Sequence, residues 1–136
     1  MLELLLASQL NCLAEAVFHE ARSETWGSQV LMAAVVKNRV LDERFEDTFC
    51  KVIEEPWQFS YTHELTEKQI EKRIESEEEA WERAQNVAYS VINSGPQPLF
   101  GNILYYHTVD ISPNWDYAKI EEVDVVGQHK FYSDKE

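Results

Sequence analysis

Two glutamates four residues apart, Glu20 and Glu24, are the side chains in this sequence best suited to acid–base chemistry. They end an apolar helical pattern and are framed by Phe18, His19 and Arg22. A carboxyl group at the edge of an apolar core is partly desolvated, which raises its pKa and lets it keep a proton near neutral pH. Such a group is the general acid that cleavage of a glycosidic bond requires. The alternative is that both are ordinary carboxylates at the end of a helix.

Aromatic side chains with polar ends are a second group that fits sugar chemistry. Sugar rings stack on aromatic faces, and their hydroxyl groups bond to polar side chains. The candidates for lining a sugar groove are Tyr61, Tyr105, Tyr106 and Trp115, each with the alternative of packing in the core or on a strand. Because neighbouring strand residues point to opposite faces, Tyr105 and Tyr106 are not expected to face the same cleft.

Other chemistries find little support. Ser23 stands where a zinc-binding HExxH motif starting at His19 would need its second histidine, and the remaining histidines are scattered. There is no GxSxG motif and no glycine-rich phosphate loop. We therefore expect neither a metal site nor a cofactor. Cys12 and Cys50 stand outside any CxxC motif, so buried thiols and a single disulfide both stay open.

Length and charge narrow the function classes further. A chain of 136 residues predicts one domain, residues 1–136. The net charge of −13, from 12 basic and 25 acidic side chains, disfavours nucleic acids and anionic membranes as partners. No apolar run has membrane-spanning length, and the N-terminus lacks the basic start of a signal peptide. We expect a monomer that is made in the cytoplasm.

Hydrophobic periodicity predicts four helices in the first two thirds of the chain. The first covers 8–21 with Ser8 as its N-cap, and the buried second helix covers 29–41. Arg39, late in that helix, is expected to form a salt bridge, at the surface or with a carboxylate of the site. A short helix at 45–53 is capped by Asp47, and 57–63 reads as a loop. The last helix covers 77–93.

Between these helices lies a charged segment, 64–79, which we interpret as a solvated helical excursion. Thr66 with Gln69 and Ser76 with Glu79 match the capping-box pattern. Three strands follow, at 103–108, 121–126 and 128–132. Together these elements predict the α+β class: a helix-rich body with a small antiparallel sheet near the C-terminus.

Several separated segments resemble the SleB-type cell wall hydrolases, the spore-cortex-lytic family. Residues 14–24 (AEAVFHEARSE) resemble its EARGE signature, and 27–40 resemble the helix that follows, with its Asn-Arg-Val ending. Residues 45–53 and the Gln58-Phe59-Ser60 loop resemble the next two family segments. Residues 104–107 and 127–132 resemble its two terminal β segments. The resemblance covers about 13–132, and the order of so many pieces makes it specific.

This resemblance implies a lysozyme-like fold and an enzyme that acts on the glycan strands of peptidoglycan. It implies a lytic transglycosylase, which cuts between N-acetylmuramic acid and N-acetylglucosamine with one carboxyl group that serves as acid and then as base. The family's catalytic glutamate falls on Glu20, and Glu24 falls on the second glutamate of the signature, with a supporting role. Gln58, Ser60, Tyr105 and Tyr106 are the expected substrate contacts.

Some features depart from the family pattern. Ser23 replaces the usual glycine, segment 64–79 resembles an insertion, and the charge is unusually negative. The sequence shows neither a separate wall-binding domain nor a signal peptide, and this combination favours a phage-encoded endolysin, made in the host cytoplasm and acting on the cell wall after release. Two alternatives stay open: a lysozyme-type muramidase that uses Glu20 and Glu24, and a non-catalytic glycan-binding or virion structural protein.

Overall fold

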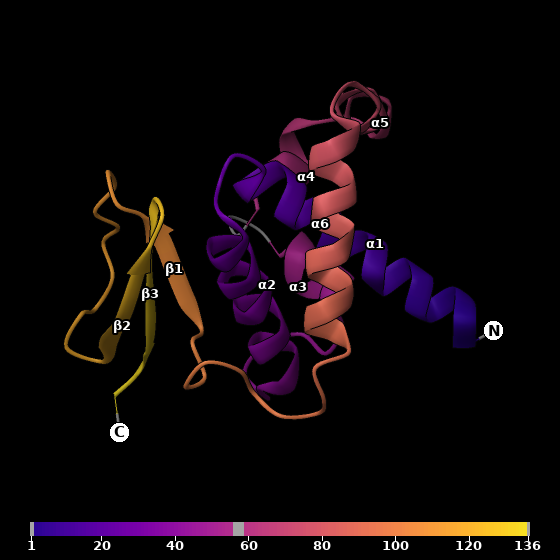
Figure 1. Cartoon of the computed structure of the whole chain (residues 1–136). Helices are drawn as coiled ribbons and strands as arrows, with labels where there is room; N and C mark the ends of the chain where they lie inside the picture. Colours follow the sequence, from indigo (N-terminus) through magenta and orange to yellow (C-terminus); the bar gives the residue numbers. More distant parts are fainter. Residues whose placement is uncertain (1, 56–58, 136) are drawn as a thin grey trace.

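A computed structural model of the chain describes residues 2–55 and 59–135, with only the backbone for residues 2–6. A body of helices lies beside a small sheet (Figure 1). The helices are α1 (Leu2–Ala21), α2 (Trp26–Leu41), α3 (Phe49–Glu54), α4 (Tyr61–Glu64), α5 (Glu67–Ser76) and α6 (Glu78–Ile92). The strands are β1 (Tyr105–Thr108), β2 (Ile120–Val126) and β3 (His129–Asp134). This is the predicted helix-rich α+β class.

Helices α1, α2 and α6 form the main core. Apolar residues at helical spacing, among them Leu13, Val17 and Phe18 of α1, are fully buried against Val87 and Val91 of α6. Removing such side chains from water is the main favourable contribution to folding. The prediction that α2 is the buried helix is confirmed, since most of its residues from Ser28 to Arg39 are buried.

The helices begin at other residues than the sequence predicts. Helix α1 begins at Leu2, so Ser8 lies inside the helix and is not its cap. Thr25 caps α2, and Thr48 replaces the predicted Asp47 as the cap of α3, with its side chain accepting a hydrogen bond from the Lys51 amide. Neighbouring hydroxyl and carboxylate side chains compete for the cap position, and the backbone conformation around them decides between them.

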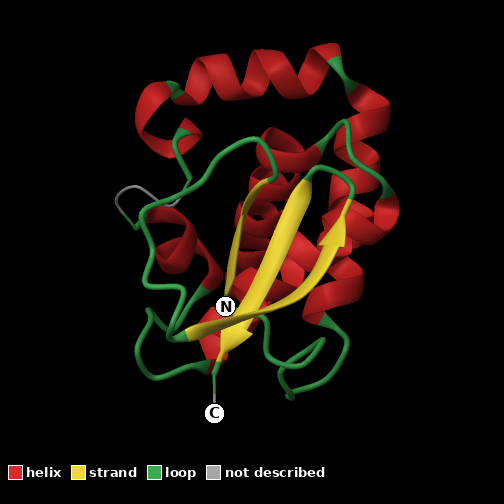
Figure 2. Ribbon diagram, turned by 90° about the vertical axis from the view of Figure 1, so that its left-hand side faces the viewer, coloured by secondary structure: helices red, strands yellow, loops and turns green. Residues whose placement is uncertain are grey.

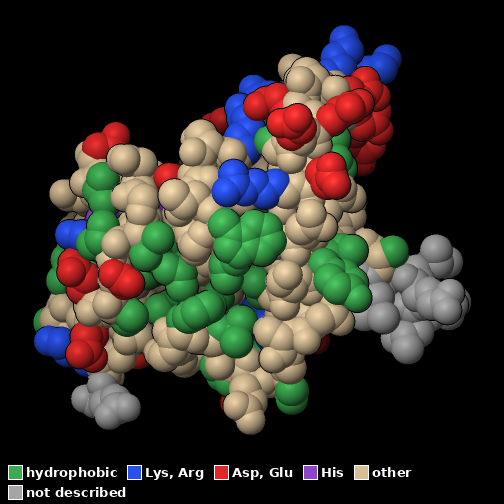
Figure 3. Space-filling view, in the orientation of Figure 1, with side chains coloured by type: hydrophobic (Ala, Val, Ile, Leu, Met, Phe, Trp, Pro, Cys, Tyr) green, Lys and Arg blue, Asp and Glu red, His purple; other side chains and the backbone are tan. Residues whose placement is uncertain are grey.

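The charged segment contains helix α5, which has no buried residue. The capping box of Thr66 and Gln69 is present, but the predicted box of Ser76 and Glu79 is wrong, because α6 starts after Glu77 without a side-chain cap. Part of the predicted loop 57–63 is helical, as α4. Figure 3 shows acidic side chains gathered where α5 meets α6, around Glu75, Glu77, Glu78 and Glu79.

The sheet has the strand order β1-β3-β2, with both pairs antiparallel and an irregularity between Glu122 and Asp124. Figure 2 shows it in front of the helices. Its inner face packs on α2, where Phe131 and Ile103 contact Ala34 and Val35. Because side chains alternate along a strand, the other face carries Tyr105, His107 and Tyr132. The sheet therefore has one apolar face and one aromatic, polar face.

Three polar residues near the end of α2 hold the segment that leads into the sheet. Lys37 donates to Oγ of Ser94, just after α6, at 2.7 Å. The Asn38 amide donates to the carbonyls of Leu99 and Ile103, both at 2.9 Å. Arg39 is 6% exposed, and its Nε donates to the Leu104 carbonyl at 2.8 Å, so the first of its two predicted alternatives, a salt bridge at the surface, is wrong. Paired backbone groups let this loop lie against the core.

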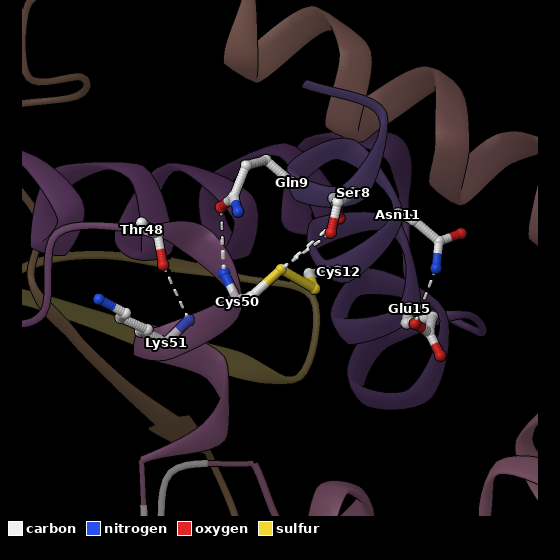
Figure 4. Close-up of a disulfide and its surroundings, with 8 residues drawn as sticks. All are labelled: Ser8, Gln9, Asn11, Cys12, Glu15, Thr48, Cys50 and Lys51. Carbon is white, nitrogen blue, oxygen red and sulfur yellow. Dashed lines mark hydrogen bonds between the residues drawn. A yellow bond between two sulfur atoms is a disulfide. The ribbon is translucent and has the colours of Figure 1, made fainter. Parts of the chain in front are cut away.

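Cys12 of α1 and Cys50 of α3 form a disulfide (Figure 4). The Gln9 side-chain oxygen accepts a hydrogen bond from the Cys50 amide at 3.2 Å in the same contact. The disulfide thus decides between the two states that the sequence left open, and it joins α3 to the helix that carries Glu20. Within residues 2–55 and 59–135, no helix is long and apolar enough to cross a membrane.

Candidate functional site

Glu20 lies in the last turn of α1 and is half-buried. Burial and, to a smaller extent, the negative charge of Glu64 together raise its pKa to about 7. A carboxyl group with this pKa exchanges its proton near neutral pH, which suits a group that must both give and take a proton. The sequence predicted this desolvation from the apolar pattern that runs into Glu20.

Two tyrosines lie near Glu20. The pKa of Tyr61 and the pKa of Tyr106 are both raised, mainly by burial and further by the charge of Glu20. Both hydroxyl groups therefore stay protonated and can donate hydrogen bonds. Tyr106 comes from β1 and Tyr61 from α4, so the surroundings of Glu20 combine the sheet with the helical body.

His19 holds Tyr61 in place. The two rings stack with their centroids 4.2 Å apart, and Nδ1 of His19 donates to the Glu15 carbonyl at 2.8 Å. Burial lowers the pKa of His19, with Arg22 and Arg73 adding to the effect, so the ring is neutral at pH 7. Its Nε2 is buried and has no hydrogen-bond partner among the described residues. His19 is therefore a neutral packing partner of Tyr61 with one free acceptor.

Glu24 is directed to the turn between β2 and β3. Its Oε1 accepts hydrogen bonds from the Gln128 amide at 2.9 Å and from Nδ1 of His129 at 3.0 Å. Gly127 has a φ of +59°, and a Cβ at that position would lie 2.8 Å from Oε2 of Glu24. The carboxylate is thus enclosed by the turn, and its side chain is only 11% exposed.

His129 contacts both Glu24 and Tyr106. It is buried, Oγ of Ser28 lies 3.4 Å from its Nδ1, and its ring meets the Tyr106 ring at 5.4 Å, nearly edge-on. Burial lowers the pKa of His129, and the charge of Glu24 opposes this shift. Contacts therefore run from Glu24 through His129 to Tyr106, whose pKa is raised in part by the charge of Glu20.

The predicted substrate contacts are separated by the structure. Tyr106 packs on the inner face of the sheet against Phe131, whereas Oη of Tyr105 donates to Asp134 at 3.0 Å, so the expectation that they face apart is confirmed. Ser60 is exposed at the start of α4. Gln58 lies outside the described residues. Trp115 packs against His107 and Tyr132 on the outer face of the sheet.

Two residues near this site were not singled out by the sequence. Gln29 is fully buried, and its Nε2 donates to the Ala21 carbonyl at 2.8 Å, which holds the end of α1 beside Glu20. His129 appeared only as one of the scattered histidines. Gln29 is a polar residue in an otherwise apolar helix, and this pattern could have marked it as a buried polar group. His129 stands two residues before Phe131 on the same strand, so it could have been placed on the same, inner face of the sheet.

A cavity of about 510 Å³ lies beside Tyr61, which is one of its lining residues. It is lined by the disulfide, by Glu15 and by residues of α4 and α5, while Glu20 does not line it. Over residues 2–55 and 59–135, no group of three or more His, Cys, Asp or Glu side chains is arranged to hold a metal ion.

Two solved structures are similar to this chain over its whole fold. The catalytic domain of the Bacillus cereus SleB protein superimposes with a TM-score of 0.72 at 28% sequence identity, covering 92% of this chain and 89% of that domain. The catalytic domain of a germination-specific lytic transglycosylase SleB from Bacillus anthracis gives a TM-score of 0.69 at 26% identity, covering 92% and 93%.

Curated relatives agree with these structures. The spore cortex-lytic enzymes of Oceanobacillus iheyensis and Bacillus cereus are 32% and 31% identical to this chain over 125 residues, which is 91% of it. The chain spans 41% and 44% of their lengths, so it corresponds to less than half of each relative. Residues 23–132 match the sequence profile of the Cell Wall Hydrolase family, and the chain therefore belongs to that family.

Proposed function

We propose that this protein cleaves the glycan strands of peptidoglycan as a lytic transglycosylase, with Glu20 as its single acid and base. The observation that carries the proposal is the half-buried Glu20 with its pKa raised to about 7, at the end of a helix that resembles the family's EARGE signature. The bond broken is the β-1,4 link between N-acetylmuramic acid and N-acetylglucosamine.

In the first step, protonated Glu20 gives its proton to the glycosidic oxygen, and the bond from the muramic acid C1 to that oxygen breaks. Positive charge develops at C1, and the ionised carboxylate of Glu20 stabilises it. In the second step, the muramic acid's own hydroxyl attacks C1, and Glu20 takes up the hydroxyl proton. The anhydro sugar leaves, and Glu20 is again protonated.

Glu24 has a positioning role in this proposal. An inverting hydrolase needs a second carboxylate about 6.5–9.5 Å from the acid, with a water molecule between the two. Oε1 of Glu24 already accepts two hydrogen bonds, and Gly127 closely approaches Oε2. This arrangement supports a transglycosylase over a muramidase, because Glu24 is occupied in holding the β2–β3 turn.

Substrate contacts follow from the same geometry. Ser60 and the hydroxyl of Tyr106 lie on the two elements that flank Glu20, so we propose them, with Gln58, as contacts of the reacting sugars. Tyr105 faces the other side of its strand and would contact a more distant part of the glycan.

We also propose that the protein is a phage endolysin that reaches the wall only after release from the host cytoplasm. Expression in a host without any phage release protein tests this point. The protein should remain with the cells, and its unaided appearance in the periplasm or medium would contradict the proposal.

The test of the enzymatic proposal is digestion of purified peptidoglycan, with mass spectrometry of the released muropeptides. Wild type and a control variant, Glu82→Gln on the exposed face of α6, should release anhydro-muramic products. Glu20→Gln should release none while remaining folded. Products with an ordinary reducing end would favour hydrolysis. Absence of any product from wild type, with wall binding kept by wild type and Glu20→Gln alike, would favour a non-catalytic glycan-binding protein.

A further inference from the structure

A second groove lies at the outer edge of the sheet, away from Glu20. It has a volume of about 440 Å³, within the range of roughly 300–1,000 Å³ typical of sites for small ligands. Its walls come from the end of α2, the α2–α3 loop, β1 and the segment 115–120. Figure 1 shows the connection from β1 to β2 running along the side of the sheet that faces away from α2.

Aromatic rings form part of this groove. Tyr105 and Trp115 lie with their ring centroids 6.2 Å apart, and Phe45 lies across from them with the buried guanidinium of Arg39 5.1 Å from its ring centroid. Each of the three rings is partly exposed. Aromatic faces of this kind stack on the apolar face of a sugar ring.

Beside the rings, Asp134 and Arg44 form a fixed polar pair. Oδ1 of Asp134 accepts from Oη of Tyr105 at 3.0 Å, and its Oδ2 accepts from Nη2 of Arg44 at 2.6 Å. Arg44 also donates to both oxygens of Asp42, through Nε and Nη2. These hydrogen bonds use Nε and Nη2 of Arg44, so among the described residues its Nη1 hydrogens stay available, and each oxygen of Asp134 has a further lone pair. The pair can therefore donate to and accept from vicinal hydroxyl groups or an acetamido group.

The charge of the groove also differs from that of the rest of the chain. Its lining residues include three cations, Arg39, Arg44 and Lys119, and two carboxylates, Asp116 and Asp134. The whole chain carries −13, which repels acidic wall polymers over much of its surface. A glycan strand with acidic substituents meets less repulsion at this groove than elsewhere.

We propose that this groove is a secondary glycan subsite that binds an N-acetylhexosamine unit of the strand at a distance from the cleaved bond. The inference rests on the proposed function, because it takes the same polymer as ligand. Trp115 and Tyr105 stack on the sugar, while Asp134 and Arg44 bind its polar substituents. The subsite holds the strand and takes no part in bond cleavage.

The test uses the full chain with Glu20→Gln, so that no ligand is consumed. The probe is β-1,4-linked N-acetylglucosamine oligosaccharides, titrated into ¹⁵N-labelled protein and followed by NMR. The Trp115 indole N–H and the amides of 115–120 should shift and saturate. Adding Trp115→Ala should weaken binding at the groove roughly ten-fold, whereas Trp26→Ala, at an exposed tryptophan outside the groove, should not.

A second variant is needed in case Trp115→Ala does not fold. Arg44→Gln changes an exposed side chain and should weaken binding without affecting thermal unfolding. Unshifted signals at the groove, unchanged affinity in both variants, or equal shifts caused by sodium acetate alone would each overturn the proposal. Muropeptide release by protein with an intact Glu20 is measured separately, so a failed subsite and a failed enzymatic function give different results.

Discussion

Glu24, just after α1, and His129, at the start of β3, form a buried pair in which His129 Nδ1 lies 3.0 Å from Glu24 Oε1. The contact joins the helical body to the sheet beside Tyr106. Desolvated pairs of this kind cost more to break than exposed ones, because the remaining partner stays buried without its hydrogen bond. This pair therefore ties the sheet to the end of the helix that carries Glu20, in addition to the packing of the sheet on α2.

Replacing Glu24 by Ala should destabilise the protein by about 1–3 kcal/mol, because the Gln128 amide and His129 lose their acceptor. Thermal or denaturant unfolding measures the change. Glu122→Ala is the matched control, since Glu122 pairs with Lys130 in an exposed bridge on the same sheet that should contribute less than about 1 kcal/mol. Equal losses in the two variants would contradict a structural role for Glu24.

Gly127 tests the close approach of the turn to Glu24. Gly127→Ala places a Cβ 2.8 Å from Oε2 of Glu24 at a φ of +59°, whereas Gly101→Ala at a φ of +69° meets nothing within 4 Å. Both variants share the cost of a left-handed backbone, about 1 kcal/mol. Gly127→Ala should lose about 1–2 kcal/mol more in unfolding experiments, because the Glu24 contacts must shift. Equal losses of stability in Gly127→Ala and Gly101→Ala would contradict a close contact between the turn and Glu24.

The pH dependence of activity should follow the ionisation of Glu20. A general acid must be protonated in the free enzyme, so kcat/KM should fall as the pH rises through about 7. Glu64→Gln removes a like charge, lowers the pKa of Glu20 and should move this fall to lower pH by a fraction of a unit. Glu71→Gln, on exposed α5, is the control and should leave the profile in place.

The same pKa shift predicts a stability effect. Folding raises the pKa of Glu20 from 4.5 to about 7, so the folded state holds the proton more tightly than the unfolded state. The contribution of Glu20 to the free energy of unfolding is therefore most favourable below pH 4.5 and decreases as the pH rises through about 7. At pH 8, the free energy of unfolding of Glu20→Gln should exceed that of wild type by about 1–3 kcal/mol, as measured by denaturant unfolding. At pH 4 this difference should disappear.

Reducing the disulfide should destabilise the fold. Cys12 and Cys50 are separated by 38 residues, and opening a loop of that length costs about 2–4 kcal/mol in typical cases. Thermal unfolding with and without dithiothreitol should show a lower midpoint in the reduced protein. The Cys12→Ser/Cys50→Ser variant should unfold near the reduced midpoint and should not respond to dithiothreitol. If the unfolding midpoint of wild type were the same with and without dithiothreitol, the prediction would be contradicted.

The sequence by itself determined the features that depend on local patterns. Apolar spacing placed Glu20 at the end of a helix and identified α2 as the buried helix, since periodicity determines which face of a helix leaves water. The Thr66 capping box is a contact across three residues, and the sequence predicted it correctly. Alternation along β1 separated Tyr105 from Tyr106 for the same local reason.

Only the tertiary structure decided which distant groups meet. It paired Glu24 with His129, bonded Cys12 to Cys50, and buried Arg39, for which the sequence had left a surface location open. Each of these side chains has several chemically acceptable partners in the sequence. The choice among them depends on how the helices and the sheet pack, because a polar group that leaves water must take the partner that packing brings within hydrogen-bond distance.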